Sequence, residues 1–562
     1  MSNLPPVDRR RFLTGSLAAA TVAAASPGLL SACSTPTSAG KNTTKINQSV
    51  QLPTYMPYAG VHPDLPGDTQ GLLDGFLSYP ASPLQAFTAA PASGGAVSGF
   101  VQTALPVPPS AGQNKYWQQL NAKLGVTLSL TIVPTADWPA KFATLVAGGS
   151  GGLPDIIEPA TALPNGLPAG INDLPAWLAA ECQDLSEFLA GDAIKEYPFL
   201  ANLPTASWRE LCVYNGGIYG LPTPRGVAGT LMFRRDDIFG QLGVNPNPAS
   251  FAEFHSMARQ VTDPKKNRWA FAQSPTGFIQ NMLGVPNATP GWILSSGKLT
   301  AVYETELIKQ ALSDAAQMVK EGLVHPGSFD PGAPTKLWFN AGNALLTADR
   351  YTGWPQYYAQ NVAGPGFDIG GMRPPLYNGG GFAPTTQSQA GNNFTALKKA
   401  GKTRIKQLLA ICNWLAAPFG TQEYLFRKFG IVGTDYTLHG SSPILTQTGV
   451  TETALGIRYI VDAPDVLFVP GQPQATRKAY DYQASIIPIS VKDPTFGLFS
   501  NAWSTKQAAL SLIINTSQND ILQGRAPVSS WSDTVKAWQQ AGGNQVRTEY
   551  EQQLAKAGGS AG

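Results

Sequence analysis

The amino-acid sequence predicts an α/β protein with at least two domains. Apolar stretches with the two-residue period of strands alternate with stretches of helical period, which is typical of a parallel sheet covered by helices. The chain of 562 residues is longer than one hydrophobic core normally supports. Its 47 prolines and 58 glycines indicate many turns between short elements.

The N-terminus has the pattern of an export signal. The basic residues Arg9 to Arg11 precede an uncharged stretch from Leu17 to Leu30. This stretch is short and has a basic flank, as in a secretory signal, whereas a membrane-spanning helix needs about 20 apolar residues. The arginines resemble a twin-arginine export signal, although Asp8 stands where Ser or Thr is preferred. We expect residues 1–32 to be removed as a signal peptide.

The signal ends in Leu30-Ser31-Ala32-Cys33, which resembles a bacterial lipobox. The resemblance implies that the thiol of Cys33 carries a diacylglyceryl anchor and begins the mature chain. Two acyl chains give stable attachment because each buried methylene contributes about 0.8 kcal/mol. Small and polar residues dominate residues 34–45, so we expect a flexible tether over 33–49.

Regular elements follow an irregular but aromatic-rich arm over residues 46–95, which we expect to be ordered. The alternating segments predict strands at Val97–Leu105, Val126–Val133, Asp155–Ile157, Ile218–Leu221, Thr230–Phe233 and Ala344–Ala348. The segments of helical period predict helices at Lys115–Leu124, Lys141–Ala147, Phe251–Val261, Glu306–Glu321, Lys402–Ala416, Thr421–Phe429, Lys506–Leu512 and Thr534–Gln540. Ser250 is the expected N-cap of the third helix, and Gly148–Gly152 is expected to break the second.

Cysteine and charge patterns exclude several classes of protein. Outside the cell a disulfide between Cys182 and Cys212 is possible, and Cys412 lies in an apolar helical run that predicts a buried thiol. The four histidines are scattered without metal-ligand spacing. The net charge is only +3, and the basic residues are not clustered as in a nucleic-acid-binding protein.

Several motifs, in order along the chain, resemble the extracellular solute-binding proteins of carbohydrate ABC importers, in particular their long lipoprotein subgroup. The matching segments are Asn114–Val126, Asp137–Ile156, Asn215–Pro222, Leu231–Asp236, Gly297–Leu299, Glu321–Val324, Phe339–Ala348 and Gly524–Tyr550. Each motif alone is weak, but together they cover nearly the whole mature chain.

This resemblance implies a periplasmic-binding-protein-like fold of type II, in which two α/β lobes close on a ligand like a hinge. Lobe one is expected over residues 50–225 plus about 375–440, and lobe two over residues 226–374 plus about 441–562. The implied function is capture of a carbohydrate, specifically an oligosaccharide, by a monomer that delivers it to ABC importer permease subunits.

Candidate binding residues follow from the resemblance and from the chemistry of sugars, whose C–H faces pack on aromatic rings while polar side chains bind the hydroxyls. They lie after strands, in the hinge and in a late loop: Glu158, Arg225, Gln273, Trp292, Asp349, Arg350, Tyr351, Trp354, Phe496 and Trp503. Trp354 is the first choice for a stacking platform. A plainer interpretation stays open, because most tryptophans pack in the core and the arginines could form only salt bridges.

Some long members of the family have a calcium loop after the helix that ends here at Val261. Calcium needs six to eight oxygen ligands, and Lys265 and Lys266 stand where such ligands are required. We therefore expect no calcium there, and no metal or cofactor elsewhere.

Two alternatives have different chemistry. Gly148–Gly152 matches the G-x-S-x-G pattern of a serine hydrolase, but a helix precedes it and a strand follows, the reverse of a nucleophile elbow. The adjacent Asp236 and Asp237 project apart and cannot flank one glycosidic bond. A surface-anchored glycoside hydrolase is therefore disfavoured. A binding protein for another solute, such as a short peptide, remains the main alternative.

Overall fold

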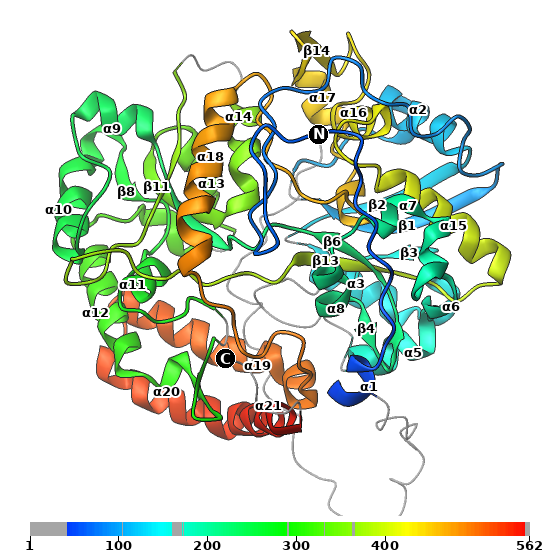
Figure 1. Ribbon diagram of the computed structural model, residues 1–562. Helices are drawn as coiled ribbons and strands as arrows, with labels where there is room; N and C mark the ends of the chain where they lie inside the picture. The colour runs from blue at the N-terminus through cyan, green and yellow to red at the C-terminus, as the bar shows by residue number, and fades with distance from the viewer. Residues whose placement is uncertain are drawn as a thin grey trace, which may run out of the picture. The chain divides into compact units, whose positions relative to one another are not determined.

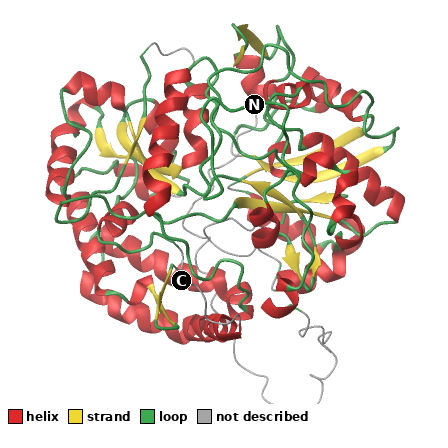
Figure 2. Ribbon diagram, viewed as in Figure 1, coloured by secondary structure: helices red, strands yellow, loops and turns green. Residues whose placement is uncertain are grey.

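Two separate β-sheets with their covering helices organise the chain and define its two lobes. In the computed structural model the described residues are 42–103, 105–135, 137–159, 171, 173–288, 291–330, 332–361 and 366–556. The two sheets lie on opposite sides of the view in Figure 1, and Figure 2 shows helices around both. The signal peptide, its twin arginine, Cys33 and the first part of the expected tether lie outside the described residues.

The sheet of lobe one has five strands in the order β2-β1-β3-β13-β6. These strands are β1 (Ala96–Thr103), β2 (Thr127–Pro134), β3 (Ile156–Ile157), β6 (Leu221–Pro224) and β13 (Gly391–Leu397). Strand β1 runs parallel to β2 and β3, with Ala96 opposite Thr127. Strand β13 is antiparallel to β3 and β6.

The sheet of lobe two has four strands in the order β12-β7-β11-β8. They are β7 (Thr230–Arg234), β8 (Trp269–Phe271), β11 (Ala344–Arg350) and β12 (Gly370–Met372). Only β11 and β8 are parallel, while β7 is antiparallel to both β11 and β12. The expected parallel pairing is confirmed for β1 with β2 and β3 and for β8 with β11, but both sheets also contain antiparallel strands that the sequence did not predict. Strands β7 and β13 each follow a segment that enters from the other lobe, and both run against the parallel strands.

The remaining elements surround these sheets. The helices are α1 (Thr44–Gln48), α2 (Lys115–Leu124), α3 (Trp138–Ala147), α4 (Gly149–Gly152), α5 (Leu174–Glu181), α6 (Ser186–Leu189), α7 (Pro198–Ala201), α8 (Thr205–Leu211), α9 (Asp236–Leu242), α10 (Phe251–Val261), α11 (Thr276–Met282), α12 (Glu306–Lys320), α13 (Thr335–Asn340), α14 (Trp354–Gln360), α15 (Lys402–Leu415), α16 (Gln422–Phe429), α17 (Gln447–Glu452), α18 (Pro473–Ile486), α19 (Asn501–Leu522), α20 (Trp531–Trp538) and α21 (Asn544–Lys556). Three hairpins pair β4 (Val213–Tyr214) with β5 (Gly217–Ile218), β9 (Trp292–Ser295) with β10 (Lys298–Ala301), and β14 (Tyr436–His439) with β15 (Ser442–Leu445).

Local signals account for the helices that the sequence placed correctly. Helix α2 begins where the Asn114 side chain accepts a hydrogen bond from the Trp117 amide at 2.8 Å, and it ends at Gly125 with φ of 70°. Ser250 caps α10 by accepting from the Glu253 amide at 3.3 Å, as expected. The expected break at Gly148 is confirmed, because α3 ends at Ala147, and the glycines that follow form the separate short helix α4.

Buried side chains form a separate core around each sheet. The core of lobe one includes Val97, Leu120 and Ile156. It also includes Leu455, Ile457, Ile460 and Val461, from a stretch that the sequence had assigned to lobe two. We therefore place the third passage between the lobes after Val461, whereas the division into lobes otherwise stays as proposed.

The described N-terminal residues are more ordered than a tether would be. Helix α1 is capped by Thr43, and two asparagines, one before the helix and one within it, bind the β4–β5 turn. The Asn42 side chain accepts from the Asn215 amide at 2.7 Å, and Asn47 accepts from Gly216 at 3.0 Å. Farther along, the expected order of the aromatic arm is confirmed by Phe76, whose ring stacks on Phe419 at 4.3 Å.

The three cysteines among the described residues, Cys182, Cys212 and Cys412, are free and buried. The disulfide that the sequence left open is therefore not formed in this structure, and the buried thiol expected at Cys412 is confirmed. Burial raises the pKa of all three thiols. Such thiols are poor nucleophiles.

Candidate functional site

Strand ends from both lobes converge on one cleft, which we call the strand-end cleft. Gln102 and Thr103 at the end of β1 line it from lobe one, and Asp349 and Arg350 at the end of β11 line it from lobe two. Arg225, in the segment between β6 and β7, lines it as well. Its volume is about 550 Å³, within the range of small-ligand sites. Ligands of open α/β sheets bind at such carboxyl ends of strands.

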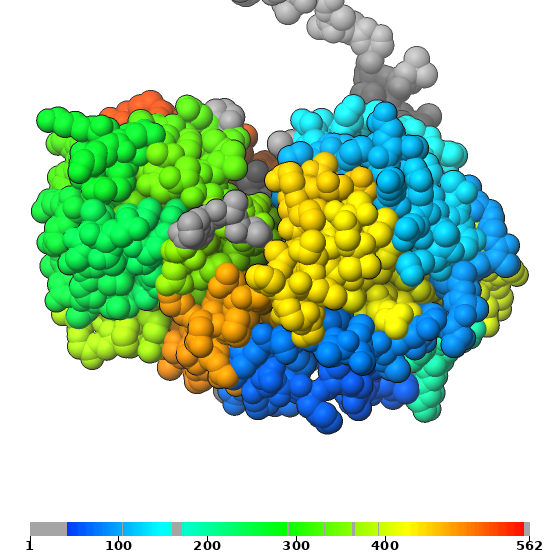
Figure 3. Space-filling model, turned by 90° about the horizontal axis from the view of Figure 1, so that it is seen from above, coloured from blue at the N-terminus to red at the C-terminus, as the bar shows by residue number. Residues whose placement is uncertain are grey.

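The two lobes face each other across this cleft. Seen from above in Figure 3, the yellow surface around α16 and α17 stands opposite the green surface around α13 and α14. Lys336 of α13 and Gln356 of α14 line the cleft on that side. A ligand in the strand-end cleft would therefore touch both lobes.

A buried ionic cluster lies beside the hinge and lines the cleft. Asp462 accepts from Arg427 Nη1 at 2.7 Å, from Lys428 Nζ at 3.0 Å and from Arg225 Nη1 at 3.2 Å. The Asp462 side chain is 5% exposed and that of Arg427 is 1% exposed. Burial alone would raise the pKa of Asp462, but the surrounding cations outweigh it and hold that pKa well below its usual value. The cluster joins two of the segments that pass between the lobes.

Glu158 lies next to this cluster but has no free face. It is fully buried at the end of β3 and accepts hydrogen bonds from the amide and side chain of Gln102 and from the Asn393 side chain. Burial raises its pKa to about 7, partly opposed by these hydrogen bonds and by Arg225. Glu158 therefore supports Gln102, which lines the cleft.

The end of β11 presents a second polar group. Asp349 forms an ion pair with Lys336 at 2.9 Å and accepts a hydrogen bond from the Tyr357 hydroxyl at 2.9 Å. Its carboxylate also accepts from the Arg350 amide at 2.8 Å. The structure therefore brings three of the expected site residues, Arg225, Asp349 and Arg350, to one cleft.

The expected stacking platform is not on the surface of this cleft. Trp354 is 0% exposed and packs against Phe233, Tyr351 and Tyr482, with ring centroids 5.3 to 6.0 Å apart. Tyr351 is also buried, and its hydroxyl donates to the Ala479 carbonyl at 2.8 Å. Both rings lie beneath the backbone that lines the cleft. The plainer interpretation, core packing, applies to them.

Gln273 is likewise engaged within lobe two. Its side-chain nitrogen donates to the Ala348 carbonyl at 2.7 Å, and its oxygen accepts from the Thr347 hydroxyl at 3.0 Å. These bonds tie the residue after β8 to β11. Gln273 is not among the residues that line the cleft.

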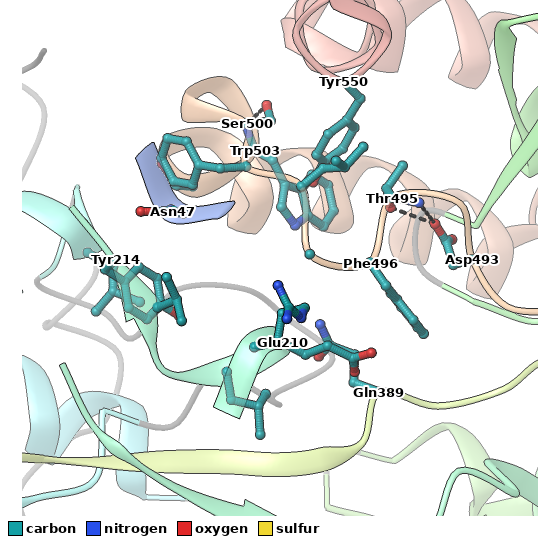
Figure 4. Close-up of a pocket in the computed structure, with 18 of the residues that line it drawn as sticks. Asn47, Glu210, Tyr214, Gln389, Asp493, Thr495, Phe496, Ser500, Trp503 and Tyr550 are labelled. Atoms are coloured by element: carbon teal, nitrogen blue, oxygen red, sulfur yellow. Dashed lines mark hydrogen bonds between the residues drawn. The ribbon is translucent and has the colours of Figure 1, made fainter. Parts of the chain in front are cut away.

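The other three candidates line a second pocket, which we call the α8–α19 pocket. Trp292, Phe496 and Trp503 contribute to this cavity of about 490 Å³. Figure 4 shows Tyr214 on one side and Trp503 with Tyr550 on the other, with Phe496 beside Glu210 and Gln389. Trp292 is 2% exposed, and its amide donates to Asp493 at 3.1 Å.

The strand-end cleft is the stronger candidate of the two. The α8–α19 pocket is formed mainly by helix ends and by the 493–507 segment, without the ends of parallel strands. An ion pair between Lys492 and Glu210, 2.6 Å long, joins its two walls. The ten expected residues therefore divide between two cavities and the core beneath them.

Sequence reasoning missed four charged residues that line the strand-end cleft, Lys336, Arg427, Lys428 and Arg458, and also Asp462 beneath them. Arg427 and Lys428 sit in the last turn of α16, where basic residues are common because they complement the helix dipole. Their sequence context therefore indicated only a helix end. Asp462 meets Arg225 across 237 positions of sequence, which no local pattern reveals.

Within the described ranges, no cluster of three or more His, Cys, Asp or Glu side chains could hold a metal ion. The segment that replaces the calcium loop is a tight turn closed by backbone hydrogen bonds between Asp263 and Arg268. Lys266 there lies 3.7 Å from the Asp263 carboxylate. The absence of calcium binding stays a prediction.

Among the described residues, no helix combines the length and the apolar character needed to cross a bilayer.

Comparison with known families gives a match over more than half of the chain. The model of bacterial extracellular solute-binding proteins covers residues 115–434. No curated protein sequence matches the chain.

Solved structures share the fold over most of the length. The alginate-binding protein AlgQ2 is 14% identical with a TM-score of 0.61, covering 83% of this chain and 99% of its own. The FusA substrate-binding protein of Streptococcus pneumoniae, solved with kestose, is 13% identical with a TM-score of 0.60, over 82% and 99%. The N-glycan transport solute-binding protein of the same species is 13% identical with a TM-score of 0.58, over 82% and 99%. At this identity the likeness establishes the two-lobe fold.

Proposed function

This chain belongs to the family of bacterial extracellular solute-binding proteins, and from that premise we propose that it captures an oligosaccharide and delivers it to the permease of an ABC importer. The ligand binds in the strand-end cleft to a monomer. We propose no catalytic step. The observation that carries this proposal is the convergence of the ends of β1 and β11 with the hinge residue Arg225.

Carbohydrate is favoured over a short peptide by the structural relatives. Their names describe binding of alginate, kestose and N-glycans. The polar side chains at the cleft, such as Gln102, Thr135 and Gln356, suit hydroxyl groups. A thermal-shift screen of oligosaccharides and of tripeptides on the signal-free chain separates the two classes, because a ligand that binds only the native state raises the melting temperature.

Binding should close the hinge. A ligand that contacts both lobes stabilises the closed form over the open one. We expect small-angle scattering to give a smaller radius of gyration with a saturating ligand from the screen, and no change with a non-binding sugar. An unchanged radius with bound ligand would contradict the hinge mechanism, although not binding itself.

The protein is proposed to be held at the outer face of the cytoplasmic membrane by lipid on Cys33. The Cys33→Ala protein should appear in the culture or soluble fraction, because two acyl chains are the expected anchor. Immunoblots of fractions after a salt wash measure this, with Cys412→Ala as the matched cysteine control that should stay on the membrane. Retention of Cys33→Ala on membranes would rule out the anchor.

A further inference from the structure

We propose that the strand-end cleft selects an acidic saccharide, whose carboxylate or sulfate group binds beside Arg225, Arg427 and Arg458. This inference rests on the proposed function and specifies its class of substrate. It comes from the charge and the unused hydrogen-bond donors of the cleft.

Cationic side chains dominate the lining. Of the described lining residues, six are basic and one is a carboxylate, Asp349. The basic residues are Arg225, Lys336, Arg350, Arg427, Lys428 and Arg458. Asp349 is already paired with Lys336. Two carboxylates, Asp462 and Asp465, lie beneath this surface. They face the four cations Arg225, Arg427, Lys428 and Arg458, so positive charge remains in excess.

The guanidinium groups also hold donors that no protein group accepts. Nη2 of Arg225, Nε and Nη2 of Arg427, and Nε of Arg458 are buried without a hydrogen-bond partner. Arg225 and Arg427 are 8% and 3% exposed, and both line the cleft. Buried charged donors without partners are costly, and guanidinium binds planar carboxylate or sulfate oxygens through paired hydrogen bonds. These donor atoms have almost no exposed surface in this structure, so a ligand reaches them only when the arginine side chains turn toward the cleft. An anion would then satisfy both the donors and the charge, whereas a neutral hydroxyl would satisfy only the donors.

Lys428 belongs to the same buried cluster. Burial and the neighbouring Arg427, Arg458 and Arg225 lower its pKa to about 7, although Asp462 acts in the opposite direction. The Tyr424 ring lies 5.7 Å from its ammonium group. A bound anion would raise this pKa again, so that anion binding would be coupled to proton uptake above pH 7.

The experiment compares three trisaccharides by calorimetry on the signal-free chain. The probes are trigalacturonate, a sulfated galactotriose and neutral galactotriose. At least one acidic probe should bind about tenfold or more tightly than the neutral one, since a hydrogen bond to a charged group contributes that much. A carboxylate preference and a sulfate preference are both supporting results, and they identify the source of the charge.

The pH profile is a second readout. Affinity for the acidic probe should fall as pH rises from 6 to 9, because the bound anion favours protonated Lys428 and disfavours ionised Glu158. Affinity for the neutral probe should change little. An acidic probe that binds tightly with a flat profile would overturn the placement of the anion beside Arg225, Arg427 and Arg458, whose cluster includes Lys428.

Substitution locates the group. Arg458→Gln should weaken binding of the acidic probe about tenfold or more, and should weaken binding of the neutral probe by a clearly smaller factor. Arg525→Gln removes the same charge from an ion pair with Asp520 remote from the cleft, and should change neither affinity. Melting curves test whether both variants fold. If Arg458→Gln does not fold, the salt dependence of the parent protein's affinity for the acidic probe decides, because an ionic contact weakens with added salt.

The outcomes separate the two proposals. Equal or tighter binding of neutral galactotriose overturns the acidic preference and leaves oligosaccharide capture intact. If neither these probes nor any oligosaccharide of the screen binds, the proposed function itself fails.

Discussion

Replacement of Asp462 with asparagine should lower the free energy of unfolding by about 3–5 kcal/mol. Asp462 is buried and is the common acceptor for Arg225, Arg427 and Lys428. Asparagine has a similar volume but no charge, so the three cations would repel one another in a poorly solvated site. Urea denaturation at pH 7 measures the loss.

An exposed aspartate is the control. Asp192 forms an ion pair with Lys195 at 2.8 Å, with its side chain 70% exposed, and Asp192→Asn should leave the unfolding free energy nearly unchanged. Similar small effects of both substitutions would mean that the cluster does not stabilise the hinge region. If added sulfate raises the unfolding free energy of Asp462→Asn but not that of the parent protein, this would agree with positive charge that the substitution leaves unpaired.

The same carboxylate predicts sensitivity to acid. The pKa of Asp462 is lower in the folded state than in the unfolded state. Its contribution to the free energy of unfolding is therefore fully present above the unfolded-state pKa near 3.9, and it is lost as the pH falls through the lower pKa of the folded state. The stability difference between the parent protein and Asp462→Asn should therefore shrink below about pH 4. Asp462 and Arg225 belong to different passages between the lobes, so the cluster also joins these two segments.

Local features of the sequence were sufficient for many elements. Helix α2 has the predicted bounds because its cap and its C-terminal glycine are both encoded within a few residues. Strand direction was not predictable in the same way. Strand β13 pairs with β3 and β6 from far along the chain, and only the passage between lobes determines that it runs antiparallel. Helix α19 continues well beyond the predicted Lys506–Leu512 at both ends.

The site was predictable where position along a strand determines it. Asp349 and Arg350 follow from the end of β11, and Arg225 follows from the hinge. Arg427 and Asp462 could not be found, because the cluster exists only when distant segments fold together. Trp354 was misplaced for a different reason: an aromatic residue after a strand can turn toward the cleft or toward the core, and the sequence pattern is the same for both.

Truncation of this tryptophan should therefore reduce stability more than affinity. Trp354→Ala removes a fully buried ring from contact with Phe233 and Tyr482, and such substitutions cost about 3–5 kcal/mol because the cavity relaxes only partly. Because Trp354 is buried, we expect Trp354→Ala to disrupt core packing and not to remove a stacking platform for the sugar. Urea denaturation and calorimetry with the ligand from the screen measure the two effects separately.

The control is Trp503→Ala, because Trp503 is only partly buried and lines the α8–α19 pocket. It should lower the unfolding free energy less than Trp354→Ala does. Without denaturant, the folded Trp354→Ala protein should keep most of the affinity of the parent protein for the ligand. The reason is that Thr352 and Gly353, not the indole, line the strand-end cleft. If Trp354→Ala instead has normal stability and a thirtyfold lower affinity, then Trp354 contacts the ligand, and the binding site within lobe two lies at this ring.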